Sequence, residues 1–275
     1  MIKFSCLITV YSGTVLPFFK EAIDSIVHQT VQPDEMIIVI DGTIKFELEE
    51  FINEFISLAI IPNCKKIQLE ENIGAGPARN IGIKSASFDW IAIMDCDDYA
   101  VKSRFEKQAA VASTIPDVDF ICSLSEEYNE SFEEASYITT KKCPQSSASI
   151  KRRLNFNCCI TNPTIFFRKK VWEKTNGYAS FRFLNEDHFF FLKVAKHDYD
   201  FYCIQEALLK VRIGKEQRKR RSGWKLFVTD FHFRYHCFKK GLIDFKGLMI
   251  LMPLFVRRFT PSFLLPHLHK FWRSI

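Results

Sequence analysis

Aspartates follow two apolar segments of the chain, at the points where those segments end. Asp41 follows one of them, and Asp95, Asp97 and Asp98 follow the other. Three carboxylates within four residues repel one another, and a bound divalent cation would neutralise them. Carboxylates together with substrate phosphates are the usual ligands of Mg²⁺ and Mn²⁺ in nucleotide chemistry. The pattern therefore predicts a magnesium or manganese site, with a solvated turn that caps the next helix as the alternative interpretation.

The elements that would position these aspartates alternate between short apolar runs and helical spacing. The runs predict strands at 6–10, 36–40, 67–69 and 90–94, and the spacing predicts helices at 16–27, 48–56 and from about 78. Such alternation implies right-handed crossovers and an α/β fold with an open, mostly parallel sheet that helices cover on both faces. Ligands of such sheets bind outside the carboxyl ends of the strands, where Asp41 and Asp95 are expected.

The middle of the chain loses this alternation. Residues 125–160 are dominated by Ser, Glu, Tyr, Lys and Thr, which favours a loop region on the substrate side over core. A strand at 164–167, a helix at 187–197 and a strand at 201–204 are expected after it. We therefore divide the chain into a domain at 1–212, with halves at about 1–124 and 125–212, and a helical extension at 213–275.

The composition is that of a globular protein with an uneven charge. Of the 275 residues, 47% are apolar and the formal net charge is +6. Residues 213–275 contain 14 Lys or Arg and 3 Asp or Glu, so this segment is strongly basic while the rest of the chain is acidic. No apolar run approaches the roughly 18 residues that cross a bilayer, and the first residues lack signal-peptide features. These features predict a cytoplasmic protein.

The basic, aromatic-rich extension predicts an anionic partner. Its charge beside apolar segments favours a helix on an anionic membrane, and thus a peripheral position on the inner face of the plasma membrane. Nucleic acid is not expected, because no nucleic-acid-binding motif accompanies the charge. A solvated helical face is the alternative. Trp224, Phe227, Phe231 and Tyr235 recur at helical spacing, which favours a core-facing stripe over a sugar-stacking surface.

The nine cysteines favour a reducing compartment over a disulfide framework, because their number is odd and their spacing irregular. No C-x-x-C pair is present, so the sequence does not predict structural zinc. Cys158 and Cys159 are adjacent, but buried and unreactive cysteines are the commoner case.

Several segments resemble one known family in the right order. The nucleotide-sugar half of the inverting family 2 glycosyltransferases, which have the GT-A fold, is similar to four segments here: PFFKEAIDSIVHQT, IIVIDGT, NIGAGPARNIGIKSA and WIAIMDCDDYAVKSRFEKQ. The acceptor half of that family is similar to NPTIFFRKKVWEKTNGY and FLNEDHFFFLKVAKH. The resemblance covers residues 1 to about 212.

The resemblance implies roles for individual residues toward the nucleotide and the metal. Asp41 would contact the uracil or ribose, although many members have two acids before the glycine at this turn and this chain has one. The ARN segment would line the nucleotide pocket. Asp95, Asp97 and Asp98 match the D-x-D-D motif of the family, in which the middle acid faces the ribose and the last faces the metal. The donor site would thus comprise Asp41, Arg79, Asn80, Asp95 and Asp97, and the metal ligands would be Asp97 and Asp98.

The resemblance also implies the reaction. Asp187 falls on the catalytic base of the family, which takes the proton of an acceptor hydroxyl as it attacks the anomeric carbon. Mn²⁺ or Mg²⁺ would stabilise the departing nucleoside diphosphate. The expected activity is hexosyl transfer with inversion from a nucleotide sugar, with a UDP-sugar favoured, to a saccharide or lipid-linked saccharide. Members of the family often act in bacterial surface polysaccharide or lipopolysaccharide synthesis.

Other interpretations explain fewer of these features. Gly74 and Gly76 begin a dinucleotide fingerprint, but Arg79 stands where its third glycine would be. The 95–98 acids could be a phosphotransferase pair, but such pairs usually follow the first strand. Without the resemblance, Glu186 and Asp187 would be read as a helix cap. A non-catalytic nucleotide-sugar-binding assembly subunit of the same fold is the remaining alternative.

Overall fold

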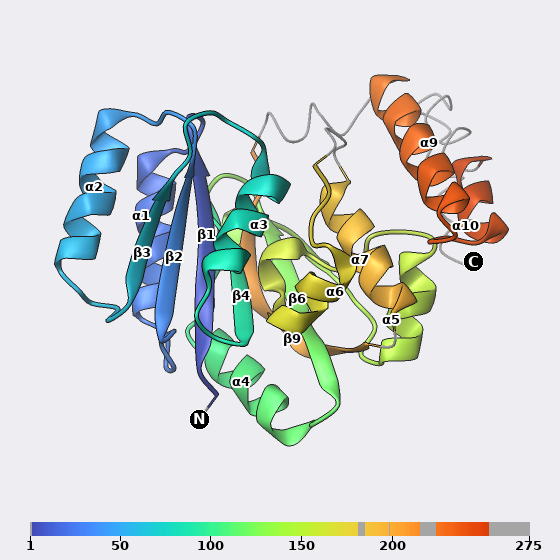
Figure 1. The fold of residues 1–275 in the computed structure, drawn as a ribbon, viewed down its shortest axis with the longest axis horizontal. Coiled ribbons are helices and arrows are strands. Elements are labelled where there is room, and N and C mark those ends of the chain that lie inside the picture. Colours follow the sequence, from blue (N-terminus) through green and yellow to red (C-terminus); the bar gives the residue numbers. More distant parts are fainter. Residues whose placement is uncertain (1, 181–184, 198, 215–223, 253–275) are drawn as a thin grey trace.

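One twisted sheet organises the computed structural model, which describes residues 2–180, 185–197, 199–214 and 224–252 (Figure 1). Its strand order is β3-β2-β1-β4-β8-β6-β9-β5, and β7 pairs with β6. The first four strands are parallel, as the alternating pattern predicts. They are β1 (Phe4–Tyr11), β2 (Glu35–Asp41), β3 (Cys64–Gln68) and β4 (Trp90–Asp95). The helices between them are α1 (Leu16–Val27), α2 (Phe46–Ser57) and α3 (Ala75–Ser85), and α3 begins three residues earlier than expected.

Helices cover both faces of this sheet, which confirms the predicted α/β architecture. Side chains of a strand alternate between faces, and Leu7 of β1 belongs to one buried cluster while Cys6 and Ile8 belong to another. The cluster of Leu7 contains residues of α3, and the cluster of Ile8 contains residues of α1 and α2. A Cβ on Gly82 of α3 would lie 2.3 Å from Leu7, so glycine lets this helix pack closely on the sheet.

The second half of the sheet mixes directions. β6 runs parallel to β9, whereas β8 is antiparallel to both β4 and β6 and joins the two halves. The bounds are β5 (Tyr99–Ala100), α4 (Arg104–Thr114), β6 (Val118–Tyr128), β7 (Tyr137–Lys141), α5 (Ser147–Leu154), β8 (Phe166–Arg168), α6 (Lys169–Thr175), α7 (Glu186–Lys196) and β9 (Asp200–Arg212). Short 3₁₀ turns lie at Glu134–Ser136 and Asn162–Thr164, so the strand expected at 164–167 is shorter and later.

Residues 125–160 are not a loop outside the core, and that expectation was wrong. β6 continues to Tyr128, and β7 and α5 follow it. Ile150 and Leu154 of α5 are fully buried, and Cys143 and Ile160 join the same cluster. The polar composition concealed these elements, because β6 obtains its partners from β9, more than 70 residues later in the chain.

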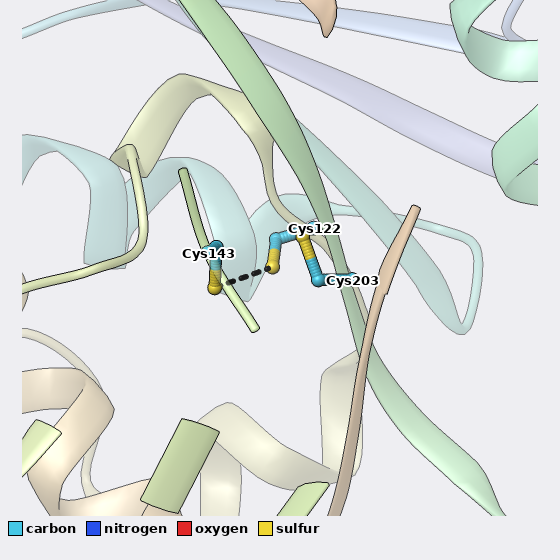
Figure 2. A group of neighbouring side chains, drawn as sticks. All are labelled: Cys122, Cys143 and Cys203. Carbon is cyan, nitrogen blue, oxygen red and sulfur yellow. Dashed lines mark hydrogen bonds between the residues drawn. The ribbon is translucent and has the colours of Figure 1, made fainter. Parts of the chain in front are cut away.

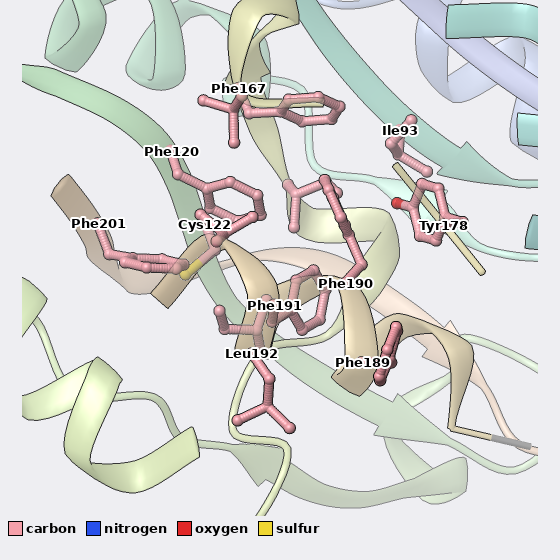
Figure 3. Packing of buried hydrophobic residues seen from close by; sticks show 14 of the residues in the cluster. Ile93, Phe120, Cys122, Phe167, Tyr178, Phe189, Phe190, Phe191, Leu192 and Phe201 are labelled. Carbon is pink, nitrogen blue, oxygen red and sulfur yellow. The ribbon is translucent and has the colours of Figure 1, made fainter. Parts of the chain in front are cut away.

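Phenylalanines fill the core beneath α7 (Figure 3). The ring of Phe120 on β6 contacts the rings of Phe190 and Phe191 on α7 and that of Phe201 on β9. Aromatic pairs of this kind bury large areas and prefer tilted or edge-on geometries. This core fixes the position of α7, which carries Asp187 in its first turn.

The described part of the C-terminal extension contains α9 (Trp224–Lys239) and α10 (Phe245–Met249), which lie beside α5 and α7 (Figure 1). Buried Arg234 donates hydrogen bonds to the carbonyls of Phe156 and Gly247. Most of the described residues at 224–252 are helical, but the expected core-facing stripe is wrong in its last members, because Phe231 and Tyr235 are exposed. Phe233 and Cys237 are buried instead.

Residues 215–221, the densest part of the predicted basic surface, and residues 253–275 lie outside the described residues. Within the described ranges no helix is both long and apolar enough to cross a bilayer.

Candidate active site

The acidic turn follows β4 at the carboxyl edge of the sheet, where the sequence places it. β4 ends at Asp95, and Asp97 and Asp98 form the turn before β5. Asp98 is buried, and its carboxylate accepts a hydrogen bond from the backbone N–H of Arg212 at 3.0 Å. This contact attaches the turn to the end of β9, so the acids do not belong to a freely solvated turn.

Burial and mutual repulsion shift the pKa values of this turn upward. Burial and the neighbouring Asp95 raise the pKa of Asp97 to about 6, and the charge of Arg212 partly opposes the rise. Burial, followed by the charges of Asp97 and Asp95, raises the pKa of Asp98 well above its ordinary value. Burial and repulsion make these carboxylates unfavourable in their charged form, and a bound cation would stabilise that form.

Arg79 of α3 joins the acidic turn to the first turn of α7. Its guanidinium contacts Asp95 at 2.8 Å, and Glu186 and Asp187 at 3.3 Å each. Arg79 is buried, and its carbon centre lies 5.6 Å from the ring centroid of Tyr178. Its Nε is buried and has no hydrogen-bond partner among the described residues, so a donor atom remains available there.

The two acids of α7 differ from ordinary surface carboxylates. Burial raises the pKa of Asp187, and Arg79 opposes this rise. Burial and the charge of Asp187 raise the pKa of Glu186 to about 7. A partly buried carboxylate of raised pKa beside a fixed cation is suited to accept a proton near neutral pH. His188, the next residue, is buried and bonds to the carbonyl of Leu154, as expected of a packed histidine.

Asp41 and Asn80 have structural partners. The carboxylate of Asp41 accepts the backbone N–H groups of Ile73 and Gly74 at 2.8 and 3.0 Å, which holds the loop before α3. Asn80 accepts the indole N–H of Trp172 and exchanges hydrogen bonds with the backbone of Tyr178. These contacts order the walls of the site, and their expected contacts with a nucleotide stay predictions.

The family model that describes glycosyl transferase family 2 matches residues 5–174. This chain belongs to glycosyl transferase family 2. A β-1,3-galactosyltransferase of Escherichia coli, named for UDP-Gal and α-D-GlcNAc-diphosphoundecaprenol, is 30% identical over 95% of this chain and 93% of its own length. The amylovoran biosynthesis glycosyltransferase AmsE of Erwinia amylovora is 25% identical over 93% of this chain and 97% of its own. The chain is therefore a glycosyltransferase.

Solved structures share the fold of this glycosyltransferase. TarS 1–349 of S. aureus, in complex with UDP-GlcNAc, has a TM-score of 0.64 at 17% identity and covers 84% of this chain. The mannosyltransferase PcManGT of Pyrobaculum calidifontis, in complex with GDP-Man and Mn²⁺, has a TM-score of 0.62 at 14% identity and covers 85% of this chain. The chain spans less than two thirds of these two proteins, 65% and 64%. The likeness confirms the GT-A fold.

The donor set of this family 2 glycosyltransferase fits a hard divalent cation. Asp97 and Asp98 offer carboxylate oxygens, the ligands that Mn²⁺ and Mg²⁺ prefer, and the raised pKa values mark charges that a cation would relieve. The three aspartates do not form a closed cage: within the described ranges, the one group of three metal-binding side chains with ligand atoms within 4.8 Å of one another consists of cysteines. Such an open set leaves room for substrate phosphates.

Two further arginines at the acidic turn were not found from the sequence. Arg212 donates from Nε to the carbonyl of Asp97 at 3.0 Å and from its terminal nitrogen to Glu21 at 2.6 Å. Arg104 is fully buried and donates to the carbonyl of Ile93 at 2.8 Å, one residue before the end of the β4 apolar run. Arg212 lies outside the family-like segments, and Arg104 lies inside WIAIMDCDDYAVKSRFEKQ without a predicted role, so only tertiary folding brings both to this turn. Glu186 could have been found, because it is adjacent to Asp187.

Proposed function

We propose that this glycosyltransferase moves a hexose from a UDP-sugar to a hydroxyl of a lipid-linked saccharide, with inversion at the anomeric carbon. One observation carries the proposal: the buried Arg79 contacts both Asp95, beside the acidic turn, and Asp187, in the first turn of α7. A diphosphate at the acidic turn and an acceptor at Asp187 would then lie on either side of one guanidinium. In-line displacement requires the attacking and leaving groups on opposite faces of the sugar.

The residues of the chain divide the chemistry between them. The carboxylate of Asp187 takes the proton of the acceptor hydroxyl while that oxygen forms its bond to the anomeric carbon. The bond from this carbon to the diphosphate oxygen breaks, and its electron pair leaves with UDP. Asp97 and Asp98 would hold Mn²⁺ or Mg²⁺, which supplies positive charge to the leaving diphosphate. Arg79 orients Asp187 through the 3.3 Å contact.

The relatives support the substrate classes. The E. coli relative is named for UDP-Gal and a diphosphoundecaprenol-linked GlcNAc, and it matches 95% of this chain. The relative from Erwinia is named for amylovoran biosynthesis. We therefore propose a polyprenol-diphosphate-linked sugar as the acceptor and bacterial surface polysaccharide synthesis as the setting.

The substitution Asp187→Asn tests the proposal. The amide keeps the shape of the side chain but does not accept the proton, so kcat for sugar transfer should fall by about 10²–10⁴-fold while the Kd for UDP changes little. UDP release from a panel of UDP-sugars, with a GlcNAc-diphospholipid acceptor and excess Mn²⁺, measures turnover. Asp117→Asn, an exposed aspartate between α4 and β6, is the matched control.

Two outcomes contradict the proposal. Unchanged kcat in Asp187→Asn would remove Asp187 as the base. A wild-type protein that binds UDP but releases none from any UDP-sugar and acceptor pair would favour a non-catalytic assembly subunit.

The position at a membrane is also part of the proposal. Phe231, Tyr235 and Phe238 are exposed on α9, and Phe245 and Met249 are exposed on α10. Lys239 ends α9 with its Nζ 4.9 Å from the ring centroid of Tyr235, Lys240 follows the helix, and Lys246 lies in α10. Aromatic rings together with lysines are typical of surfaces that lie on anionic lipid, where a lipid-linked acceptor resides.

A further inference from the structure

Four buried cysteines from four separate segments of the chain gather in the core. Cys122 lies on β6 and Cys203 lies directly beside it on β9, in register across the parallel pair. Cys143 lies in the segment between β7 and α5, and Figure 2 shows its side chain directed at the other two. Cys159 precedes the turn at 162–164, and its thiol interacts with that of Cys143. All four are free thiols and at most 4% exposed.

The spacing of the sulfurs matches that of thiolates around one metal ion. The Sγ atoms of Cys122 and Cys143 are 4.0 Å apart, and the three Sγ atoms of Cys122, Cys143 and Cys203 all lie within 4.8 Å of one another. Zinc binds thiolate sulfur at about 2.3 Å, which places the sulfurs of a tetrahedral site about 3.8 Å apart and those of a trigonal site about 4.0 Å apart. A metal ion would therefore enter among these three with small side-chain movements, whereas Cys159 lies outside this group of three and would have to turn its thiol toward the ion.

Simple packing does not require this arrangement. A buried cysteine behaves as a small apolar residue, and Cys237 on α9 and Cys6 on β1 are buried in that way outside this group. Here the thiols instead converge on one another from segments that are 16 to 81 residues apart. A disulfide would use two of the sulfurs and leave the others without a role.

We propose that Cys122, Cys143, Cys203 and Cys159 bind one Zn²⁺ ion as a structural site, with Cys159 as the fourth ligand. Each thiol loses its proton to solvent as the ion binds, and four Zn–S bonds form with no change of oxidation state. Four protein ligands close the coordination shell, so the ion holds structure and takes no part in sugar transfer. The site is independent of the proposed function.

Lys141 and Gln205 flank the cluster. The hydrogen bond with Cys143 and burial raise the pKa of Cys159, while the positive charge of Lys141 opposes that rise. Lys141 is held at this place by its hydrogen bond to the carbonyl of Ile160 at 3.0 Å. Gln205 donates to the backbone carbonyls of Cys143 and Cys203, which fixes two of the ligand segments relative to each other.

The ion would join four segments that lie far apart in the sequence. β6 and β9 belong to the sheet, whereas Cys143 and Cys159 lie on either side of α5. Because the cluster is buried, we expect the ion to enter during folding and to resist chelators in the native protein.

Metal analysis of the full chain tests this inference. The protein is produced in zinc-supplemented medium, passed over a desalting column with EDTA, and measured by inductively coupled plasma mass spectrometry. We expect about one zinc per chain, as a closed four-thiolate site binds one ion. Cys143→Ala should lose this zinc, and Cys6→Ala, which removes an equally buried thiol, should keep it. Refolding with Co²⁺ should give the intense visible absorption of tetrahedral thiolate coordination in the wild type and the Cys6 variant only.

Thiol counting separates the remaining outcomes. The proposal is overturned when the wild type carries no more zinc than Cys143→Ala. Nine thiols that react without reductant in denaturant and chelator would then assign the cluster to packing, and seven would assign it to a disulfide. If Cys143→Ala fails to fold, Cys159→Ala takes its place. This variant should keep the fold and bind zinc at least tenfold more weakly than the wild type. Equal zinc affinity in that variant would remove Cys159 from the ligand set.

Discussion

At the scale of single residues, Arg79 affects both the pKa and the orientation of the proposed base, Asp187. Its charge lowers the pKa of Asp187 against the effect of burial. Arg79→Gln removes that charge, so the pKa of the base should rise further and the base should ionise only at higher pH. We expect the rising limb of kcat/KM against pH to move to higher pH, and kcat at its plateau to fall by about tenfold to a hundredfold because Asp187 loses its orientation.

The pH profile is measured with excess Mn²⁺, so that the acidic turn is saturated at each pH. Arg153→Gln on α5 is a suitable control, because its side chain bonds only to Asn157 among the described residues. A limb that stays in place in Arg79→Gln, with a lower plateau, would assign Arg79 to packing alone.

The residue types of the site could be predicted, but their partners could not. Asp95, Asp97, Asp98, Arg79 and Asp187 were expected at one site, and the described structure brings them together through Arg79 and the acidic turn. The sequence did not indicate that the Asp41 carboxylate holds two loop amides. Hydrogen bonds of this kind depend on which distant segments meet, and spacing along the chain does not encode that.

At the scale of elements, Glu35 connects the starts of several strands. Glu35 begins β2 and is 1% exposed, and its carboxylate accepts from Ser5 at 2.5 Å, from Ser87 at 2.8 and 2.9 Å, and pairs with Lys65 at 2.6 Å. Burial alone would raise its pKa, but Lys65 and the two serines outweigh burial, and the pKa lies below the ordinary value of 4.5.

Stability should therefore depend on the charge of Glu35. A carboxylate with a lowered pKa in the folded state stabilises the protein above its unfolded pKa, and this contribution is lost as the pH falls through the folded pKa. Glu35→Gln should lower the free energy of unfolding at pH 7 by about 1.5–3 kcal/mol, and the difference from the wild type should shrink below pH 4.5. Urea unfolding at several pH values measures this, with the exposed Glu50→Gln as the control. An equal difference at all pH values would contradict the role of charge.

Elements with a strong apolar period were predictable, and those with a polar composition were not. The apolar runs of β1, β2 and β4 and the stripes of α1 and α2 give nearly the observed bounds, because these periods are present in the sequence whichever distant strands they pair with. β6 and α5 were missed or placed in a loop region. Their polar residues lie on faces that only the pairing of β6 with β9 defines.

At the scale of the whole molecule, the exposed face of α9 and α10 predicts how the protein meets its acceptor. Phe231→Ser combined with Tyr235→Ser removes two stacked, exposed rings, so the fold should be kept. We expect co-sedimentation with vesicles of anionic phospholipid to fall several-fold, while turnover on a water-soluble acceptor stays the same.

The matched control is Phe46→Ser, an exposed phenylalanine at the start of α2 on the other side of the molecule (Figure 1). Equal binding of vesicles by all three proteins would exclude this face as the membrane contact. Deletion of residues 213–275 is a poorer test, because α9 also covers His188 and Phe189 of α7.

The long strand β9 affects how the donor and the acceptor are positioned relative to each other. It runs through the phenylalanine core beneath α7 and continues to Arg212, which contacts the acidic turn, so a single stretch of backbone connects this core with that turn. Paired strands hardly change length. The distance between the acceptor and the diphosphate of the donor is therefore fixed by the fold. This enzyme should select its substrates by size instead of closing around them.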